Sequence, residues 1–205
     1  METIKDAPIG RAFAGSLQAR EKETYSKNSN LSRFRQRGIC KTGGSSGMYL
    51  VKAEGNQIEK IVAMSVRAFE TDVDVGGIKG DCPPGFDSVE WHKQMAREGH
   101  LYQAMIENDL VGAAIVFPDE TENSVYIGRI FIDSVYHRRG YGIRLMECLE
   151  KNFPWAAEFH LDTPCWNERT NALYNKLGYR ILKIEDGFIF YQKRKSEPNT
   201  IRNIT

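Results

Sequence analysis

From Met48 onward the chain alternates between two spacings of apolar residues, and this succession restricts the fold more than any other feature. Ile58, Ile61 and Val62 follow the spacing of an amphipathic helix, whereas 125–132 is an apolar, β-branched run typical of a strand. Strands are expected over 48–53, 101–107, 110–117, 125–132, 158–163, 179–184 and 188–192. Helices are expected over about 57–70, between Asp87 and Gly99, over about 141–153 and over 167–177. This order implies an α/β fold with a mixed central sheet and helices on both faces.

Short local signals predict where some of these elements begin and turn. Asn108-Asp109 and Asp186-Gly187 are dipeptides that favour tight hairpin turns. Asp87, with Glu90 three residues later, resembles a capping box and predicts a helix start at that point.

Charged residues are unevenly distributed along the chain. The 205 residues carry a net charge of +1, but 1–47 carry +5 and 48–205 carry −4. The first segment lacks an apolar period and ends in Gly and Ser residues, which is typical of a disordered leader and a flexible linker. We therefore expect a leader over 1–47, a globular domain over 48–194 and a tail over 195–205.

Other roles for the leader stay open. Its cluster of Arg33, Arg35, Arg37 and Lys41 suits nucleic acid, but aromatic residues are nearly absent and solvated disorder is the commoner cause of such a cluster. Nucleic-acid binding is therefore not expected. Another possibility is that the segment is an extension that is not native, with the native domain beginning at Met48. Its acidic residues disfavour organelle targeting.

Several classes of protein are excluded. No apolar run approaches the roughly 20 residues that span a bilayer, and the first residues lack the apolar centre of a secretory signal. Cys40, Cys82, Cys148 and Cys165 lie far apart and form no CxxC, which disfavours a zinc site and a disulfide framework. We expect a cytoplasmic protein with reduced thiols, no metal and no membrane partner.

The sharpest local motif is at 130–142, where an apolar strand runs through two arginines and two glycines into a helix. Gly140 and Gly142 let backbone N–H groups approach a ligand, and the helix places its positive end at the same point. Arg138 and Arg139 add charge for phosphate oxygens. The residues alone predict a pyrophosphate cradle, with a plain basic turn as the alternative. Neither GxGxxG nor GxxxxGK[ST] occurs at this motif.

A second motif gives the first its context. His137-Arg-Arg-Gly-Tyr-Gly142 is similar to the Gln/Arg-x-x-Gly-x-Gly/Ala signature of the GNAT superfamily of N-acetyltransferases, with His in place of Gln or Arg. About thirty residues on, Asn167, Tyr174 and the closing Leu177-Gly178-Tyr179 match the Asn, Tyr and Leu-Gly-Phe/Tyr of that family. The chain therefore resembles a GNAT acetyltransferase over about 48–194. The resemblance implies a sheet of about seven strands with about four helices. It also implies that the strands over 125–132 and 158–163 splay apart at the acetyl-CoA site.

The resemblance also implies acetyl-CoA as co-substrate and a set of residues that bind it. The backbone of the strand end and of the following turn would hold pantetheine and pyrophosphate, and Asn167 would contact the pantetheine arm besides capping a helix. One amide of the strand end would polarise the thioester carbonyl. The implied cofactor-binding residues are Phe131, Ile132, His137, Arg138, Arg139, Gly140, Tyr141, Gly142, Ile143 and Asn167.

Tyr174 matches the family's general acid, which protonates the departing CoA thiolate. The phenolate of tyrosine and the CoA thiolate are of similar basicity, so the phenol is a suitable proton donor to this leaving group. The Glu that some relatives use on the strand equivalent to 125–132 is missing here. Asp162 is the tentative base, Glu107 and His160 are alternatives, and the substrate could also bind as the free amine. No Cys/His pair suggests a covalent intermediate.

The residues that would bind the acceptor amine are suggested by the composition of the first helices and their loop, and not by a motif. Trp91, His92 and Tyr126 are candidates to line the acceptor pocket, with packing as the alternative role of each. The aspartates of 71–87 suit a cationic acceptor, with a solvated loop as the alternative. We expect an acyltransferase that moves acetyl directly to a primary amine, of a small molecule or of a protein. A non-catalytic acyl-CoA-binding module is the second hypothesis, and a homodimer is frequent among relatives.

Overall fold

The computed structural model describes residues 47–195, and 1–46 and 196–205 lie outside the described residues. The expected leader, its basic cluster, Cys40 and nearly all of the expected tail therefore fall outside the description. The strands are β1 (Met48–Lys52), β2 (Leu101–Ile106), β3 (Asp109–Asp119), β4 (Ser124–Ile132), β5 (Glu158–Pro164), β6 (Arg180–Glu185) and β7 (Phe188–Arg194). The helices are α2 (Ile58–Glu70), α3 (Val89–Arg97), α4 (Tyr141–Asn152) and α5 (Glu168–Lys176), with 3-10 turns η1 (Gly55–Gln57), η2 (Thr71–Val75) and η3 (Ser134–Tyr136).

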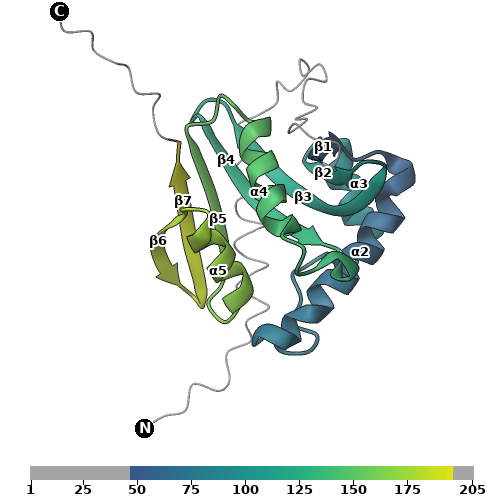
Figure 1. The fold of residues 1–205 in the computed structure, drawn as a ribbon, viewed down its shortest axis with the longest axis horizontal. Coiled ribbons are helices and arrows are strands. Elements are labelled where there is room, and N and C mark those ends of the chain that lie inside the picture. Colours follow the sequence, from purple (N-terminus) through teal and green to yellow (C-terminus); the bar gives the residue numbers. More distant parts are fainter. Residues whose placement is uncertain (1–46, 196–205) are drawn as a thin grey trace, which may run out of the picture.

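The seven strands form one twisted sheet in the order β1-β2-β3-β4-β5-β7-β6 (Figure 1). Only β4 and β5 run parallel; every other neighbouring pair is antiparallel. Helix α4 makes the crossover between the two parallel strands, as a parallel pair requires. The mixed sheet of seven strands with four helices, expected from the order of periodicities and from the GNAT resemblance, is confirmed.

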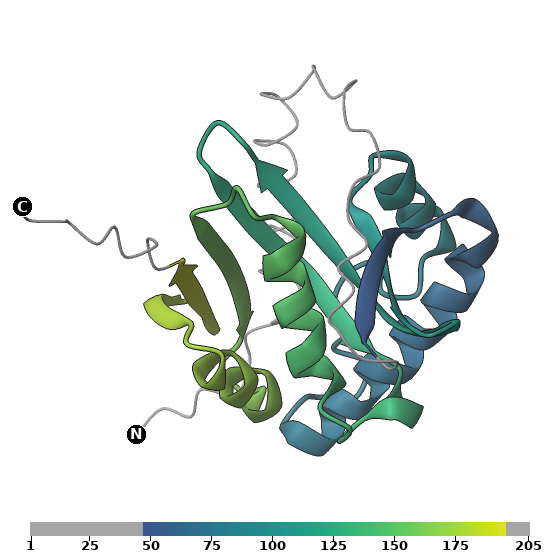
Figure 2. The same cartoon turned by 45° about the horizontal axis from the view of Figure 1, so that its top comes forward.

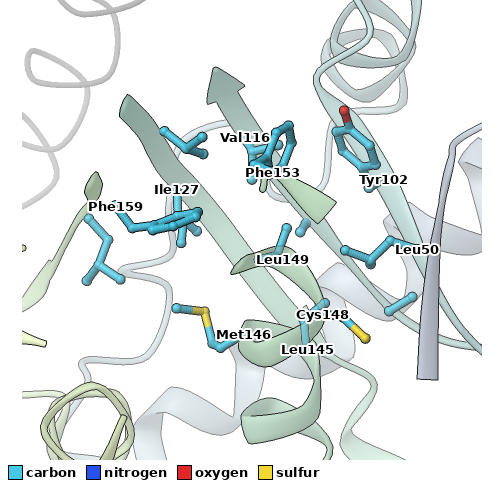
Figure 3. Close-up of a cluster of buried hydrophobic side chains, with 14 of the residues drawn as sticks. Leu50, Tyr102, Val116, Ile127, Leu145, Met146, Cys148, Leu149, Phe153 and Phe159 are labelled. Carbon is cyan, nitrogen blue, oxygen red and sulfur yellow. The ribbon is translucent and has the colours of Figure 1, made fainter. Parts of the chain in front are cut away.

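Each face of the sheet is covered by its own pair of helices (Figure 2). On one face, α4 inserts Leu145, Met146 and Leu149 against β-strand side chains such as Ile127 and Phe159 (Figure 3). On the other face, the apolar stripes of α2 and α3 pack on β2, β3 and the end of β4. Both helix pairs therefore bury the apolar residues whose period predicted them. Among residues 47–195 no helix is long and apolar enough to cross a membrane.

The sheet opens between its two parallel strands. β4 and β5 are paired only from Ser124 to Tyr126 on one strand and from Glu158 to His160 on the other. Both strands continue for several residues beyond this point without pairing to each other. A β-bulge on β4, in which Gly128 is the additional residue opposite β3, begins just past the last pair. Because a bulge increases local bending and twist, it helps to turn β4 away from β5. The expected splay is confirmed.

Two local predictions are wrong in detail. The β2–β3 turn is at Glu107-Asn108 rather than Asn108-Asp109, and Glu107 takes the positive φ of 54°. The register of the strands decides this, because a slip by one residue would turn every side chain to the opposite face. Helix α3 is capped by Ser88, whose hydroxyl accepts the Trp91 N–H at 3.2 Å, and not by Asp87. A start at Val89 places His92 and Met95 in the core.

An ion pair ties α2 to the end of β4. Arg67 donates from Nε and Nη2 to the two carboxylate oxygens of Asp133, at 3.0 and 2.5 Å. The Asp133 side chain is only 4% exposed. The hydrogen bond from Arg67 therefore holds the pKa of Asp133 below its ordinary value. The pair fixes the backbone at the entrance to the turn that precedes α4.

Arg67→Ala is expected to lower the free energy of unfolding by about 1–2 kcal/mol at neutral pH, since the Arg67 side chain is partly exposed. The pKa of Asp133 is lower in the folded state, so this stabilisation is fully present at neutral pH, begins to be lost as the pH falls below the ordinary pKa of about 4, and disappears as the pH falls through the lower folded-state pKa. Urea unfolding at pH 7 and pH 3 measures both effects. Arg97→Ala, which breaks the exposed pair with Glu90, is the matched control and is expected to change little. An equal loss at both pH values would contradict the assignment.

Candidate functional site

A cleft of about 740 Å³, including its open mouth, lies where β4 and β5 separate. Its floor comes from the unpaired part of β4, Ile127 to Ile130, and from Asp162 to Pro164 of β5. One wall comes from α2, η2 and the loop after them, and the other from α5 and β7. Its lining side chains are Phe69, Asp72, Asp81, Cys82 and Pro83 on the first wall and Trp166, Asn167, Thr170, Tyr174 and Phe188 on the second. The cleft therefore brings Asp162, Asn167 and Tyr174 together.

The turn before α4 is shaped to receive an anion. Gly140 is the N-cap residue with a φ of 75°, and Arg138 also has a positive φ, of 61°. Gly140 has no side chain to cap the helix, so within residues 47–195 the first N–H groups of α4 keep their capacity to donate. A Cβ atom at Gly140 would meet nothing within 4 Å, and one at Gly142 would meet only Leu173 at 3.6 Å. The glycines thus leave room above the helix end, and Arg138 and Arg139 are exposed there.

The backbone of β4 presents polar groups to the opening between β4 and β5. The Asp133 N–H donates to the Val111 carbonyl at 2.9 Å. Because hydrogen-bonded and non-hydrogen-bonded pairs alternate, the N–H and C=O of Phe131 face β3, and those of Ile130 and Ile132 face away from β3. His137 turns back to this strand end and donates from Nε2 to the Ile132 carbonyl at 2.8 Å. The His137 side chain therefore fixes the start of the turn rather than pointing to solvent.

Tyr174 projects from α5 into the cleft. It is 5% exposed, and its ring packs against Tyr179 and Tyr191, with centroids 5.9 and 5.6 Å apart. Its hydroxyl makes no hydrogen bond to any residue between 47 and 195. Burial, together with the charges of Asp162 and Asp72, raises the pKa of Tyr174 above its ordinary value. The phenol is consequently protonated at neutral pH.

Asn167 has structural partners on both of its polar atoms. Its Oδ1 accepts the Thr170 N–H at 3.1 Å as the N-cap of α5, and its Nδ2 donates to Asp72 at 3.3 Å. Arg169 also donates to Asp72, at 2.5 Å. Burial raises the pKa of Asp72, and the charge of Arg169 opposes this shift. These contacts fasten η2 to the start of α5 across the cleft.

Of the three candidate bases, only Asp162 lines the cleft. Tyr126 donates from its hydroxyl to Asp162 Oδ1 at 2.5 Å. Glu107 lies exposed in the β2–β3 turn, and His160 Nε2 donates to Glu158 at 3.2 Å near the start of β5. The structure therefore brings one of the three to Tyr174, whose pKa responds to the Asp162 charge.

None of the three aromatic candidates for the acceptor pocket lines the cleft itself. Trp91 stacks under the Arg129 guanidinium at 4.5 Å, and His92 is fully buried, which lowers its pKa to about 4. Arg129 lines the cleft, is 5% exposed and donates to the Pro84 carbonyl at 2.9 Å. Sequence reasoning missed Arg129 as a site residue. A charged residue within an otherwise apolar strand was the available signal.

The first wall of the cleft is electronegative. Burial raises the pKa of the Cys82 thiol, and the carboxylates of Asp72, Glu70, Asp81 and Asp87 raise it further. The Asp81 side chain lines the cleft and has no hydrogen bond or ion pair within the part of the chain that the structure describes. This wall therefore favours a cation.

No group of three or more His, Cys, Asp or Glu side chains among residues 47–195 is arranged to hold a metal ion. The three cysteines in this range, Cys82, Cys148 and Cys165, are free thiols.

Comparison with known proteins agrees with this geometry. A sequence profile of the acetyltransferase (GNAT) family matches residues 73–179. No curated protein sequence matches this chain. The fold is similar to the PaiA N-acetyltransferase of Thermoplasma acidophilum in complex with coenzyme A, at a TM-score of 0.64 and 13% identity over 73% of this chain and 99% of that one. It is also similar to a GNAT acetyltransferase of Streptococcus agalactiae, at a TM-score of 0.64 and 19% identity over 73% of this chain and 96% of that one. For the ribosomal-protein-S18-alanine N-acetyltransferase of Escherichia coli, the TM-score is 0.55 and the identity 17% over 75% of this chain and 97% of that one.

Proposed function

The chain belongs to the GNAT family of acetyltransferases, and on that premise we propose that it transfers an acetyl group from acetyl-CoA directly to a primary amine. One observation carries the proposal: the opening between β4 and β5 holds a protonated phenol, Tyr174, and a carboxylate, Asp162, in one cleft. Acetyl transfer needs a group that accepts the proton lost by the amine and a group that donates a proton to the departing CoA sulfur, and this cleft holds one of each kind.

The fit of acetyl-CoA rests on the turn before α4 and on the open edge of β4. The N–H groups of Tyr141, Gly142 and Ile143 at the helix start, with Arg138 and Arg139 beside them, would hold the pyrophosphate. The space that a Cβ at Gly140 or Gly142 would fill suits close approach of a ligand. Acetyl-CoA supplies the acetyl group as an activated thioester. The alternation along β4 favours Ile132 over Phe131 for backbone contact with the pantetheine.

Each side chain then has a separate task. Asp162 accepts the proton that the attacking amine loses, and Tyr174 donates its proton to the departing sulfur. A backbone N–H of β4 that faces the opening stabilises negative charge on the carbonyl oxygen. Asn167 caps α5 and holds Asp72, so its contribution to cofactor binding is to place the first turn of α5 beside the opening.

The acceptor is a small cationic amine in this proposal, because the cleft wall carries Asp72 and Asp81 and only Asp72 is paired with an arginine. A protein amino group is the second candidate acceptor.

Asp81→Asn is expected to raise the KM for a cationic amine about two- to fivefold, as for loss of a partly exposed ion pair. The KM for acetyl-CoA is expected to stay the same. Steady-state kinetics at low and high salt measure the effect, which should shrink as salt is added. Asp109→Asn, on the distant β2–β3 hairpin, is the matched control. An unchanged amine KM would remove Asp81 from the acceptor site.

Release of CoA thiol across a panel of amines tests the proposal as a whole. The panel should contain diamines, polyamines, amino acids, an aminoglycoside and peptides with free amino groups. Turnover with at least one amine is expected. Binding of acetyl-CoA in calorimetry without thiol release for any amine would favour the non-catalytic acyl-CoA-binding module instead.

A further inference from the structure

Tyr126 reaches across the point at which the two parallel strands part. It is the last residue of β4 that is paired with β5, where its register partner is His160. Its phenol extends past that partner and donates to Oδ1 of Asp162, two residues further along β5, at 2.5 Å. This side-chain hydrogen bond therefore spans the closed end of the opening, where backbone pairing has already stopped.

The Tyr126 ring is itself held in place. It stacks on Phe117 of β3, with centroids 6.2 Å apart and planes at 28°. Phe117 is 8% exposed and packs in turn on His100, at 4.6 Å between centroids. The donor hydroxyl is thus presented from a stack of rings on the paired part of the sheet, and not from a free surface side chain.

Asp162 is the member of this pair that reaches the cleft. It lines the cleft with Tyr174, and its charge acts on the Tyr174 phenol, whereas Tyr126 is not among the lining residues. Asp162 lies on the part of β5 that pairs with β7 but no longer with β4, and a short hydrogen bond from a fixed donor favours one of the rotamers open to its side chain.

We propose that Tyr126 is a positioning residue, which holds the Asp162 carboxylate toward the acceptor amine by a hydrogen bond across the opening between β4 and β5. The inference rests on the proposed function. Tyr126 keeps its own proton throughout: Asp162 takes the proton lost by the amine, and the phenol of Tyr126 only orients and stabilises the acceptor carboxylate. The effect therefore falls on the amine half of the reaction and not on acetyl-CoA binding.

A double-mutant cycle on the full chain tests this directly. Tyr126→Phe is expected to lower kcat/KM for the amine about tenfold, as for loss of a hydrogen bond to a charged group, and to leave the KM for acetyl-CoA within about twofold. Asp162→Asn is expected to lower kcat/KM for the amine further than Tyr126→Phe does. In the Asp162→Asn background, Tyr126→Phe is expected to have little additional effect, because the carboxylate that it positions is gone. Thermal unfolding of all four proteins accompanies the kinetics.

Tyr49→Phe is the matched control. It removes a phenol hydrogen bond of the same 2.5 Å length, to the Glu107 carbonyl, at a strand distant from the cleft, and is expected to leave the amine kinetics unchanged. Phe117→Leu keeps the Tyr126 hydroxyl but loosens its ring, and an intermediate loss is expected. A Phe117→Leu loss as large as that of Tyr126→Phe would indicate general disruption of the sheet and would overturn the inference.

The outcomes separate this inference from the function on which it rests. A wild-type enzyme that acetylates amines, with Tyr126→Phe equally damaging in both backgrounds, would overturn the positioning role alone. An unchanged amine kcat/KM in Tyr126→Phe would do the same. A wild type that binds acetyl-CoA but releases no thiol with any amine would remove the proposed function and, with it, this inference.

Discussion

Tyr174→Phe is expected to lower kcat by about two to four orders of magnitude, the range that a positioned general acid contributes. The ring contacts with Tyr179 and Tyr191 remain in this variant, and only the hydroxyl is lost. Because that hydroxyl has no hydrogen-bond partner among residues 47–195, its removal breaks no structural contact there. The Kd for acetyl-CoA, measured by calorimetry, should therefore change by less than about twofold.

Tyr102→Phe is the matched control for this variant. Tyr102 is 6% exposed, as against 5% for Tyr174, and belongs to the same apolar cluster, but it packs on Phe153 away from the cleft. It is expected to keep wild-type kcat. A Tyr174→Phe enzyme with unchanged kcat would show that the departing sulfur obtains its proton from solvent or from another group.

Gly142→Asp is expected to weaken acetyl-CoA binding about 10- to 100-fold while leaving thermal stability unchanged or slightly higher. A carboxylate in the first turn of α4 is favourable for the helix itself, by a few tenths of a kcal/mol to about 1 kcal/mol. The same carboxylate would lie where the pyrophosphate is proposed to bind, and repulsion of about 1–3 kcal/mol corresponds to that loss of affinity. Calorimetry and thermal unfolding on one preparation measure the two opposite effects.

Gly142→Asn separates charge from size. It has nearly the shape of the aspartate variant, and its Cβ would likewise meet only Leu173 at 3.6 Å. A smaller loss of affinity is expected, and it should be less sensitive to salt than that of Gly142→Asp. Equal losses for both variants at all salt concentrations would assign the effect to steric exclusion, and unchanged affinity in both would place the pyrophosphate elsewhere.

Much of the architecture could be predicted because it follows from local patterns. The apolar periods gave the helices and strands to within one or two residues, since each amphipathic stripe packs on one face of the sheet. Gly178 after α5 and Gly187 in the β6–β7 turn both take positive φ, as glycine readily does. Asn167, predicted as an N-cap, accepts the expected N–H bond. These features depend on residues that are close together in the chain.

Contacts between distant segments could not be predicted in the same way. The hydrogen bond from Tyr126 to Asp162 and the ion pair of Asp72 with Arg169 join elements that only the sheet order brings together. The placement of Asp162 in the cleft, with Glu107 and His160 outside it, depends equally on the splay. The β2–β3 turn was misplaced by one residue because pairing along two strands outweighed the preference of Asn and Asp for positive φ.

The most direct test of acetyl transfer in this cleft is a product balance with isotope-labelled acetyl-CoA and an amine that supports turnover. Mass spectrometry of the amine and titration of free CoA thiol follow the same reaction. One labelled amide is expected for each thiol released, and Tyr174→Phe should slow both signals by the same factor. Thiol release without a labelled amine would contradict the proposal, because the thioester would then be hydrolysed and not transferred.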